Sequence, residues 1–120
     1  MSDGPQRCLA GRAAAPGRVT GTVHLLNEAS LDQAIPVGAV LVLRILHPHQ
    51  APLLAGVAGI VTEEESLLQH ATTLAREFGL PAVVGVRGAT TAVREGDPIE
   101  VDGALGLVFV PDRSIEGDLL

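Results

Sequence analysis

The chain has 120 residues, the size of one ordinary domain and too few for two. Its hydrophobic fraction of 47% suffices for a core, but only 2% of the residues are aromatic, so aliphatic side chains must build that core. A net charge of −6 and the scarcity of aromatic rings argue against nucleic acid and membrane surfaces as partners. The polar start, the single Cys8 and the lack of a long apolar run are typical of a cytoplasmic chain.

The first half of the chain predicts two strands after a flexible N-terminal segment, residues 1–10. Residues 11–17 are small and punctuated by Pro and Gly. Apolar and polar residues then alternate from Arg18 to Leu26, which predicts a half-buried strand with His24 facing outward and without a chemical role. A short helix is possible around residues 29–33. Residues 39–46 are nearly all apolar, which predicts a strand covered on both faces.

The second half predicts one main helix between further strands. A short helical turn is expected at 53–57, a buried strand at 59–62 and an amphipathic helix at 66–78, ended by Gly79 and Pro81. A strand at 82–86 and a short helix at 90–94 follow. Residues 99–102 and 105–110 predict a hairpin across Gly103-Ala104. We therefore expect one compact α/β domain over residues 11–112 and a C-terminal tail over 113–120.

His70 is the residue in the main helix that points to chemistry. It lies beside the apolar stripe, in the first turns of the helix, where free backbone N–H groups favour an anion. Taken alone, it also fits a half-buried histidine that packs its ring and bonds to a neighbour.

The surrounding motifs favour the chemical interpretation. Residues 59–85 read GIVTEEESLLQHATTLAREFGLPAVVG, and Ala15-Pro16-Gly17, Glu95-Gly96-Asp97 and Val101-Asp102-Gly103 flank them. In order and spacing, these motifs resemble the swivelling phosphohistidine domain of phosphoenolpyruvate-utilising enzymes such as pyruvate phosphate dikinase and phosphoenolpyruvate synthase.

The resemblance implies the swivelling β/β/α fold and a transferase-type function. His70 would accept a phosphoryl group and carry it between a nucleotide-binding partner domain and one that binds phosphoenolpyruvate or pyruvate. Neutral imidazole is a suitable nucleophile for this step. The carrier would bind no cofactor directly, because Mg-ATP or phosphoenolpyruvate would be held on the partners. Ser66, Gln69, Arg76 and His47 are the expected substrate contacts, although Arg76 lies on a different helix flank and fits a structural role better.

The residues just before His70 depart from the family's motif, which has two glycines, a variable residue, Thr, and Ser or Cys. Here Glu65-Ser66-Leu67-Leu68-Gln69 stand at those positions, preceded by two more glutamates. One carboxylate roughly 8 Å from a phosphoryl charge costs about 2 kcal/mol at an effective dielectric near 20. The acids also fit a helix start, with Thr62 and Glu65 as a capping box.

A second histidine cluster, His47-Pro48-His49, follows the second predicted strand. One interpretation is that His47 approaches His70 and forms a two-histidine metal site with a carboxylate from 63–65. The spacing matches no recognised ligand motif, however, so a solvated loop without metal is preferred.

Two functions remain open from the sequence. The first is a phosphoryl carrier phosphorylated on His70 by partner domains, which cannot complete a phosphotransfer cycle alone. The second is a degenerate, non-catalytic domain of the same fold that serves as a binding, docking or regulatory module.

Overall fold

The structure, a computed structural model, describes residues 6–26, 35–65 and 68–112. Its strands are β1 (Gln6–Ala10), β2 (Arg12–Ala15), β3 (Arg18–Leu26), β4 (Val40–Leu43), β5 (Gly59–Thr62), β6 (Ala82–Val84), β7 (Pro98–Asp102) and β8 (Leu107–Pro111). The helices are the 3₁₀ helix η2 (Pro48–Leu54), α1 (Leu68–Phe78) and α2 (Ala89–Ala92). No helix in these ranges is long and apolar enough to cross a membrane.

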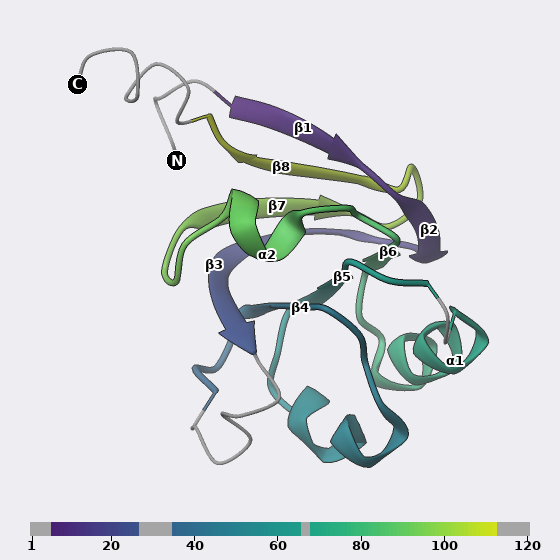
Figure 1. Cartoon of the computed structure of the whole chain (residues 1–120). Helices are drawn as coiled ribbons and strands as arrows, with labels where there is room; N and C mark the ends of the chain where they lie inside the picture. Colours follow the sequence, from purple (N-terminus) through teal and green to yellow (C-terminus); the bar gives the residue numbers. More distant parts are fainter. Residues whose placement is uncertain (1–5, 27–34, 66–67, 113–120) are drawn as a thin grey trace.

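The strands form one sheet in the order β1-β8-β7-β3-β4-β5-β6-β2, which folds into two layers. The first layer is antiparallel and contains β1, β8, β7 and the first half of β3. The second contains the rest of β3 and the parallel strands β4, β5 and β6, with β2 antiparallel at its edge. Helices α1 and η2 cover the outer face of this second layer (Figure 1). The predicted β/β/α arrangement is therefore confirmed.

Strand β4 shows how alternation fills both interfaces of this three-layer domain. Val40 and Val42 belong to the core between the two sheet layers, whereas Leu41 and Leu43 belong to the core beneath α1 and η2. All four residues are buried, as predicted for a strand covered on both faces. The strand is shorter than predicted, because the chain leaves the sheet at Arg44.

Strand β3 belongs to both layers. Residues 18–22 pair with β7, and residues 23–26 pair with β4. One face of β3 carries Arg18, Thr20 and Thr22, which are exposed. The same face carries His24 and Leu26 further along, where it lies in the parallel layer and faces the helices. The prediction that His24 faces outward is wrong for this reason, since His24 is only 5% exposed.

Other elements agree with the predictions in kind but shift in position. Helix α1 ends at Phe78 and Gly79 has φ of +69°, as its predicted role at the helix end requires. The helical turn expected at 53–57 is η2, which begins earlier, at Pro48, because proline favours the first position of a helix. The predicted helix around 29–33 and the tail 113–120 lie outside the described residues.

The first strands differ from the sequence prediction. Residues 6–10, expected to be flexible, form β1 and pair with β8. The small-residue segment that follows contains β2, which pairs with β6. Because β1 and β2 are joined through Gly11 alone, one stretch of chain closes the two layers onto each other.

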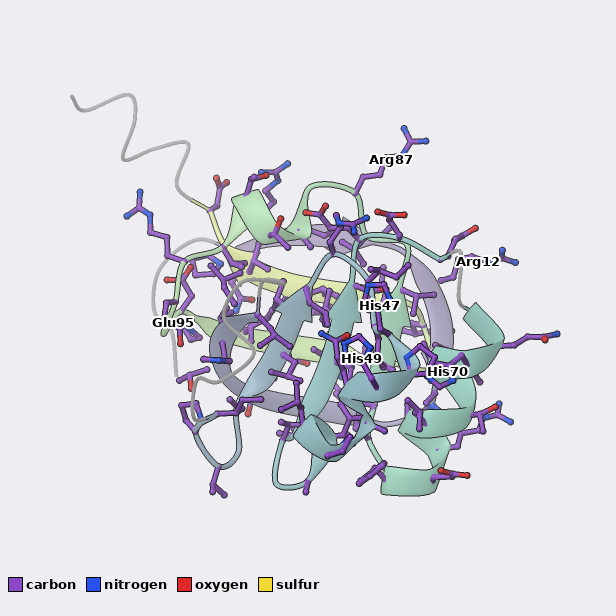
Figure 2. The ribbon with its side chains drawn as sticks, turned by 60° about the horizontal axis from the view of Figure 1, so that its bottom comes forward. Arg12, His47, His49, His70, Arg87 and Glu95 are labelled. Atoms are coloured by element: carbon purple, nitrogen blue, oxygen red, sulfur yellow. The ribbon has the colours of Figure 1, made fainter. Side chains whose placement is uncertain are left out.

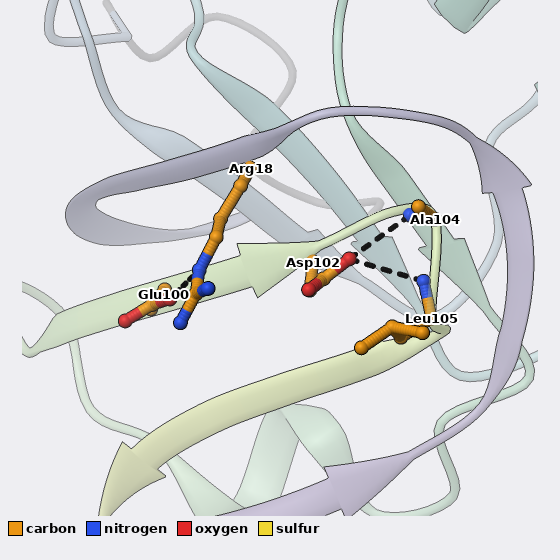
Figure 3. Close-up of polar contacts among 5 residues, drawn as sticks. All are labelled: Arg18, Glu100, Asp102, Ala104 and Leu105. Carbon is orange, nitrogen blue, oxygen red and sulfur yellow. Dashed lines mark hydrogen bonds and ion pairs between the residues drawn. The ribbon is translucent and has the colours of Figure 1, made fainter.

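The β7–β8 hairpin lies inside that closure and is held by the buried carboxylate of Asp102. Its Oδ1 accepts hydrogen bonds from the backbone N–H of Ala104 at 3.1 Å and of Leu105 at 3.0 Å (Figure 3). On the neighbouring strand, Arg18 forms an ion pair with Glu100. The hairpin predicted across Gly103-Ala104 is confirmed, and its turn extends to Gly106.

Gly103 is the residue that allows the hairpin to reach β2. Its N–H donates to the carbonyl of Gly17 at 2.7 Å, and a Cβ there would overlap the carbonyl oxygen of Ala15 and lie 3.0 Å from the backbone nitrogen of Ala82. All three atoms nearest to such a Cβ belong to the backbone, so no flexible side chain could move aside to make room for it.

Replacing Gly103 with alanine should therefore destabilise the domain by about 2 kcal/mol or more, because the overpacked site can relax only by moving strands. The free energy of unfolding in urea measures the effect. Ala104→Ser, in the same turn but exposed, should change it by less than about 0.5 kcal/mol. Equal effects of the two substitutions would contradict the close-packing explanation.

Candidate functional site

His70 lies in the first turn of α1, at the edge of the sheet where the parallel strands end. Helix α1 joins the parallel neighbours β5 and β6, so it runs back along them and begins near their carboxyl ends. The first N–H groups of a helix have no partner within the helix. The structure therefore places His70 where the sequence analysis expects it, near the start of the main helix.

The imidazole of His70 is half-buried, and its Nε2 has no hydrogen-bond partner among the described residues. This nitrogen is itself shielded from solvent. Buried polar atoms in proteins are nearly always hydrogen-bonded. The Nε2 of His24 is a second such exception among the described residues, so the missing bond supports a chemical role for His70 only together with the position of His70.

The other predicted contacts divide between the two ends of α1. Gln69 is exposed beside His70, whereas Arg76 is exposed in the last turn, about 9 Å further along the helix axis by helical rise. There its charge complements the helix dipole, as the structural role requires. Ser66 lies outside the described residues.

His47 precedes η2, in the loop that follows β4. Its N–H donates to the Oε1 of the buried Gln50 at 2.7 Å, and the N–H of Gln50 donates back to its carbonyl at 3.0 Å. The rings of His47 and His49 stack, with centroids 5.5 Å apart. Because η2 contacts α1, both histidines lie on the same side of the molecule as His70 (Figure 2). Among the described residues, no three His, Cys, Asp or Glu side chains gather closely enough to hold a metal ion.

The glutamates before α1 are each tied to a different element. Glu63 accepts hydrogen bonds from the N–H of Thr90 at 2.8 Å and from the hydroxyl of Thr90, at the start of α2. Glu64 forms an ion pair with Arg44, just after β4. Glu65 lies 3.3 Å from Arg12, at the start of β2.

The predicted capping box of Thr62 and Glu65 is wrong. Thr62 ends β5, and its hydroxyl donates to the carbonyl of Glu64 at 2.7 Å. The backbone beyond it stays extended, because Glu63 N–H donates to the carbonyl of Leu43 and Glu64 N–H to that of Arg44. These bonds to the end of β4 hold the chain out of a helical conformation, and α1 begins only at Leu68.

Arginines balance the acidic segment, and sequence reasoning overlooked them. The three glutamates, Gly85 and Arg87 line a cavity of about 450 Å³. Together with Arg12 and Arg44 in the ion pairs above, Arg87 brings the local formal charge to zero. A signal was present in the sequence: three consecutive acids with no cation beside them favour counter-ions from elsewhere in the fold.

His24 forms a second polar arrangement that the sequence did not predict. Its Nδ1 lies 2.9 Å from Oε2 of Glu95, whose Oε1 accepts the N–H of Leu25 at 2.8 Å. The turn that carries Glu95 also bonds to β3 through Gly96 and Asp97, each to the backbone of Val23. The pair thus fastens the α2–β7 turn to the edge of β3.

Comparison with known proteins identifies a family match. Residues 35–106 match the sequence model of the mobile domain of PEP-utilising enzymes. The chain is 42% identical over 107 residues to rifampicin phosphotransferase of a Streptomyces species and 39% identical over 101 residues to a probable phosphoenolpyruvate synthase of Pyrococcus abyssi. These alignments cover 88% and 84% of this chain, but only 12% of each relative.

A solved structure shows the same relationship. The solution structure of an Enzyme I protein superposes with a TM-score of 0.61 and 32% sequence identity. The superposition covers 74% of this chain and 37% of that one. In each of these relatives, the chain corresponds to one part of a larger protein.

The hydrogen bonds to Glu63 make a testable contribution to stability. Glu63→Ala should lower the free energy of unfolding by about 2 kcal/mol, because a part-buried carboxylate holds both the N–H and the hydroxyl of Thr90. Glu64→Ala is the matched control and should cost about 1 kcal/mol or less, since its pair with Arg44 is exposed. Urea unfolding measures the free energy of unfolding of both variants. An equal decrease in the two would contradict the special contribution of Glu63.

Proposed function

The chain belongs to the mobile-domain family of PEP-utilising enzymes, and we propose on that premise that it carries a phosphoryl group on His70. The observation that carries this proposal is the position of His70: first turn of α1, at the carboxyl edge of the parallel strands, with a ring nitrogen that no described residue engages.

The proposed step is a displacement at phosphorus. A neutral ring nitrogen uses its lone pair to form the N–P bond, and the P–O bond of the donor breaks with its electron pair leaving on oxygen. The other ring nitrogen keeps the proton. The acceptor reverses the step by attacking the same phosphorus, and the nitrogen regains its lone pair. Imidazole suits both directions because it is substantially neutral near pH 7.

The imidazole ring of His70 must rotate before its Nε2 can react with a donor on a partner. In the conformation described here this nitrogen is covered, so the ring has to turn before Nε2 meets a donor. No hydrogen bond from Nε2 to a described residue opposes that rotation. A structural histidine fastened at both nitrogens would lose about 1 kcal/mol for each bond broken.

Local electrostatics also support the carrier role. Three unpaired glutamates so close to the helix start would have opposed a phosphoryl group by several kcal/mol in total. In the structure, two of them are paired with arginines, one is bonded to the start of α2, and Arg87 lines the same cavity. The net repulsion expected from the sequence is therefore largely removed.

The donor and acceptor sites are proposed to lie on other domains. The chain spans about one eighth of the rifampicin phosphotransferase and phosphoenolpyruvate synthase that it resembles. Mg-ATP or phosphoenolpyruvate would bind on those partners and not on this chain. We place the carrier in the cytoplasm, which suits its exposed and unbridged Cys8.

Phosphorylation of the full chain tests the proposal. Two donors are used: potassium phosphoramidate, which needs no partner protein, and labelled phosphoenolpyruvate with a phosphoenolpyruvate synthase whose own mobile domain has been removed. The expected product is an acid-labile, base-stable adduct on His70, located by peptide mass spectrometry. His70→Asn should reduce labelling to background.

His49→Asn is the matched control, because His49 is an exposed histidine on the same side of the molecule. It should keep the wild-type rate of labelling. An adduct spread evenly over the histidines, or no adduct with either donor, would refute the carrier function.

A further inference from the structure

Glu65 differs from its two neighbours in what it touches. Its Oε1 lies 3.3 Å from Nη1 of Arg12, and its other oxygen lies over Gly85, where an added Cβ would be only 2.5 Å from Oε2. Gly85 has φ of +70°, a conformation that glycine adopts without strain. A carboxylate thus occupies the space between an arginine and a bare stretch of backbone.

This space is at the end of α1 that carries His70. Arg12 is the register partner of Val84, the residue before Gly85, so β2 and the end of β6 present both residues at the carboxyl edge. Helix α1 begins at this edge and packs against β2. Arg12 and His70 are accordingly on the same side of the domain, and the side chain of Arg12 points outward, away from His70 (Figure 2).

We propose that Glu65 is an internal anion that reserves Arg12, and that Arg12 exchanges this carboxylate for the phosphoryl group of the carrier. The inference rests on the proposed function of His70 and adds a phosphoryl-binding residue and its regulation to it. In the unphosphorylated domain, Glu65 keeps the guanidinium at the edge and closes the site to free anions. When the doubly charged group arrives, the guanidinium turns toward it and Glu65 is released to solvent.

The exchange is favourable because the existing pair is weak. The side chains of Arg12 and Glu65 are 62% and 46% exposed, and pairs of this kind contribute little to stability. A phosphoryl group offers more charge and a set of oxygens that matches the guanidinium fork. Glu64 does not compete for Arg12, since it is paired with Arg44 on the other side of the segment.

Inorganic phosphate is the probe for the test. The full chain is titrated at low ionic strength, where exposed charges are least screened, and the amide signal of Gly85 and the Nε–H signal of Arg12 are followed by NMR. Glu65→Gln should bind phosphate up to about fivefold more tightly than the wild type, because the arginine is no longer reserved. The double variant Arg12→Gln, Glu65→Gln should lose the gain.

Glu64→Gln is the matched control. It removes the same charge one residue away, and its effect on phosphate affinity should stay below about twofold. Equal gains in Glu64→Gln and Glu65→Gln would reduce the effect to general electrostatics and overturn the inference. Phosphate that binds without shifting the Arg12 signal would overturn it as well. Because the Arg12–Glu65 pair is exposed, thermal unfolding of Glu65→Gln should match that of the wild type.

The titration is repeated in the His70→Asn chain, which cannot be phosphorylated at that position. If this chain shows the same dependence on Glu65 while the wild type is never labelled, the carrier function fails and only the anion-binding part of the inference, the competition of Glu65 for Arg12, stands. If the wild type is labelled on His70 and Glu65→Gln changes nothing, the inference fails and the carrier function stands.

Discussion

The close contact between the β7–β8 turn and the strands beside it is the constraint on which the rest of the domain depends. Gly103 packs against the backbone of Ala15 and Ala82. A Cβ added at Gly106 would lie 3.0 Å from backbone atoms of Ala13, in β2, and of Gly11. Without side chains at these points, the antiparallel layer can fold over the parallel one. The fold-over holds β2 against β6, and that pairing brings Arg12 beside Gly85 and the start of α1. A packing requirement far from His70 in the sequence thus determines which cation pairs with Glu65.

The acidic segment before α1 has a different meaning in the fold than in the sequence. Glu63, Glu64 and Glu65 read as a local obstacle to phosphate when only their neighbours in sequence are considered. In the structure, each glutamate contacts a different element. Glu63 accepts hydrogen bonds at the start of α2, Glu64 pairs with the residue after β4, and Glu65 pairs with the first residue of β2. The extended segment 63–65 is thus fastened to three elements. The same acids that weaken the likeness to the family's glycine-rich motif therefore connect the end of β5 to β2, β4 and α2.

Much of the fold was predictable from local pattern, and the exceptions have identifiable causes. Strand β3, strand β5 and helix α1 follow from alternation, apolar runs and helical periodicity, as does the position of His70. Strands β1 and β2 were missed because both are short and stabilised by distant partners, and neither β1, with its mixed residues, nor the small residues of β2 show an alternating pattern. His24 was misplaced because a strand that changes layers exchanges the environments of its two faces. The partners of the glutamates come from positions more than 19 residues away in the chain, which no local pattern encodes.

The pairing of β1 with β8 has a mechanical meaning. Gln6 is the register partner of Pro111, so the first described strand begins beside the end of the last one. Helix α1 lies on the far side of the domain from that point (Figure 1). A rotation applied there acts on both strands together and stretches no strand pair. If the domain turned about this pair of neighbouring residues, His70 would be displaced further than residues near the pair, because α1 lies at the opposite side of the domain.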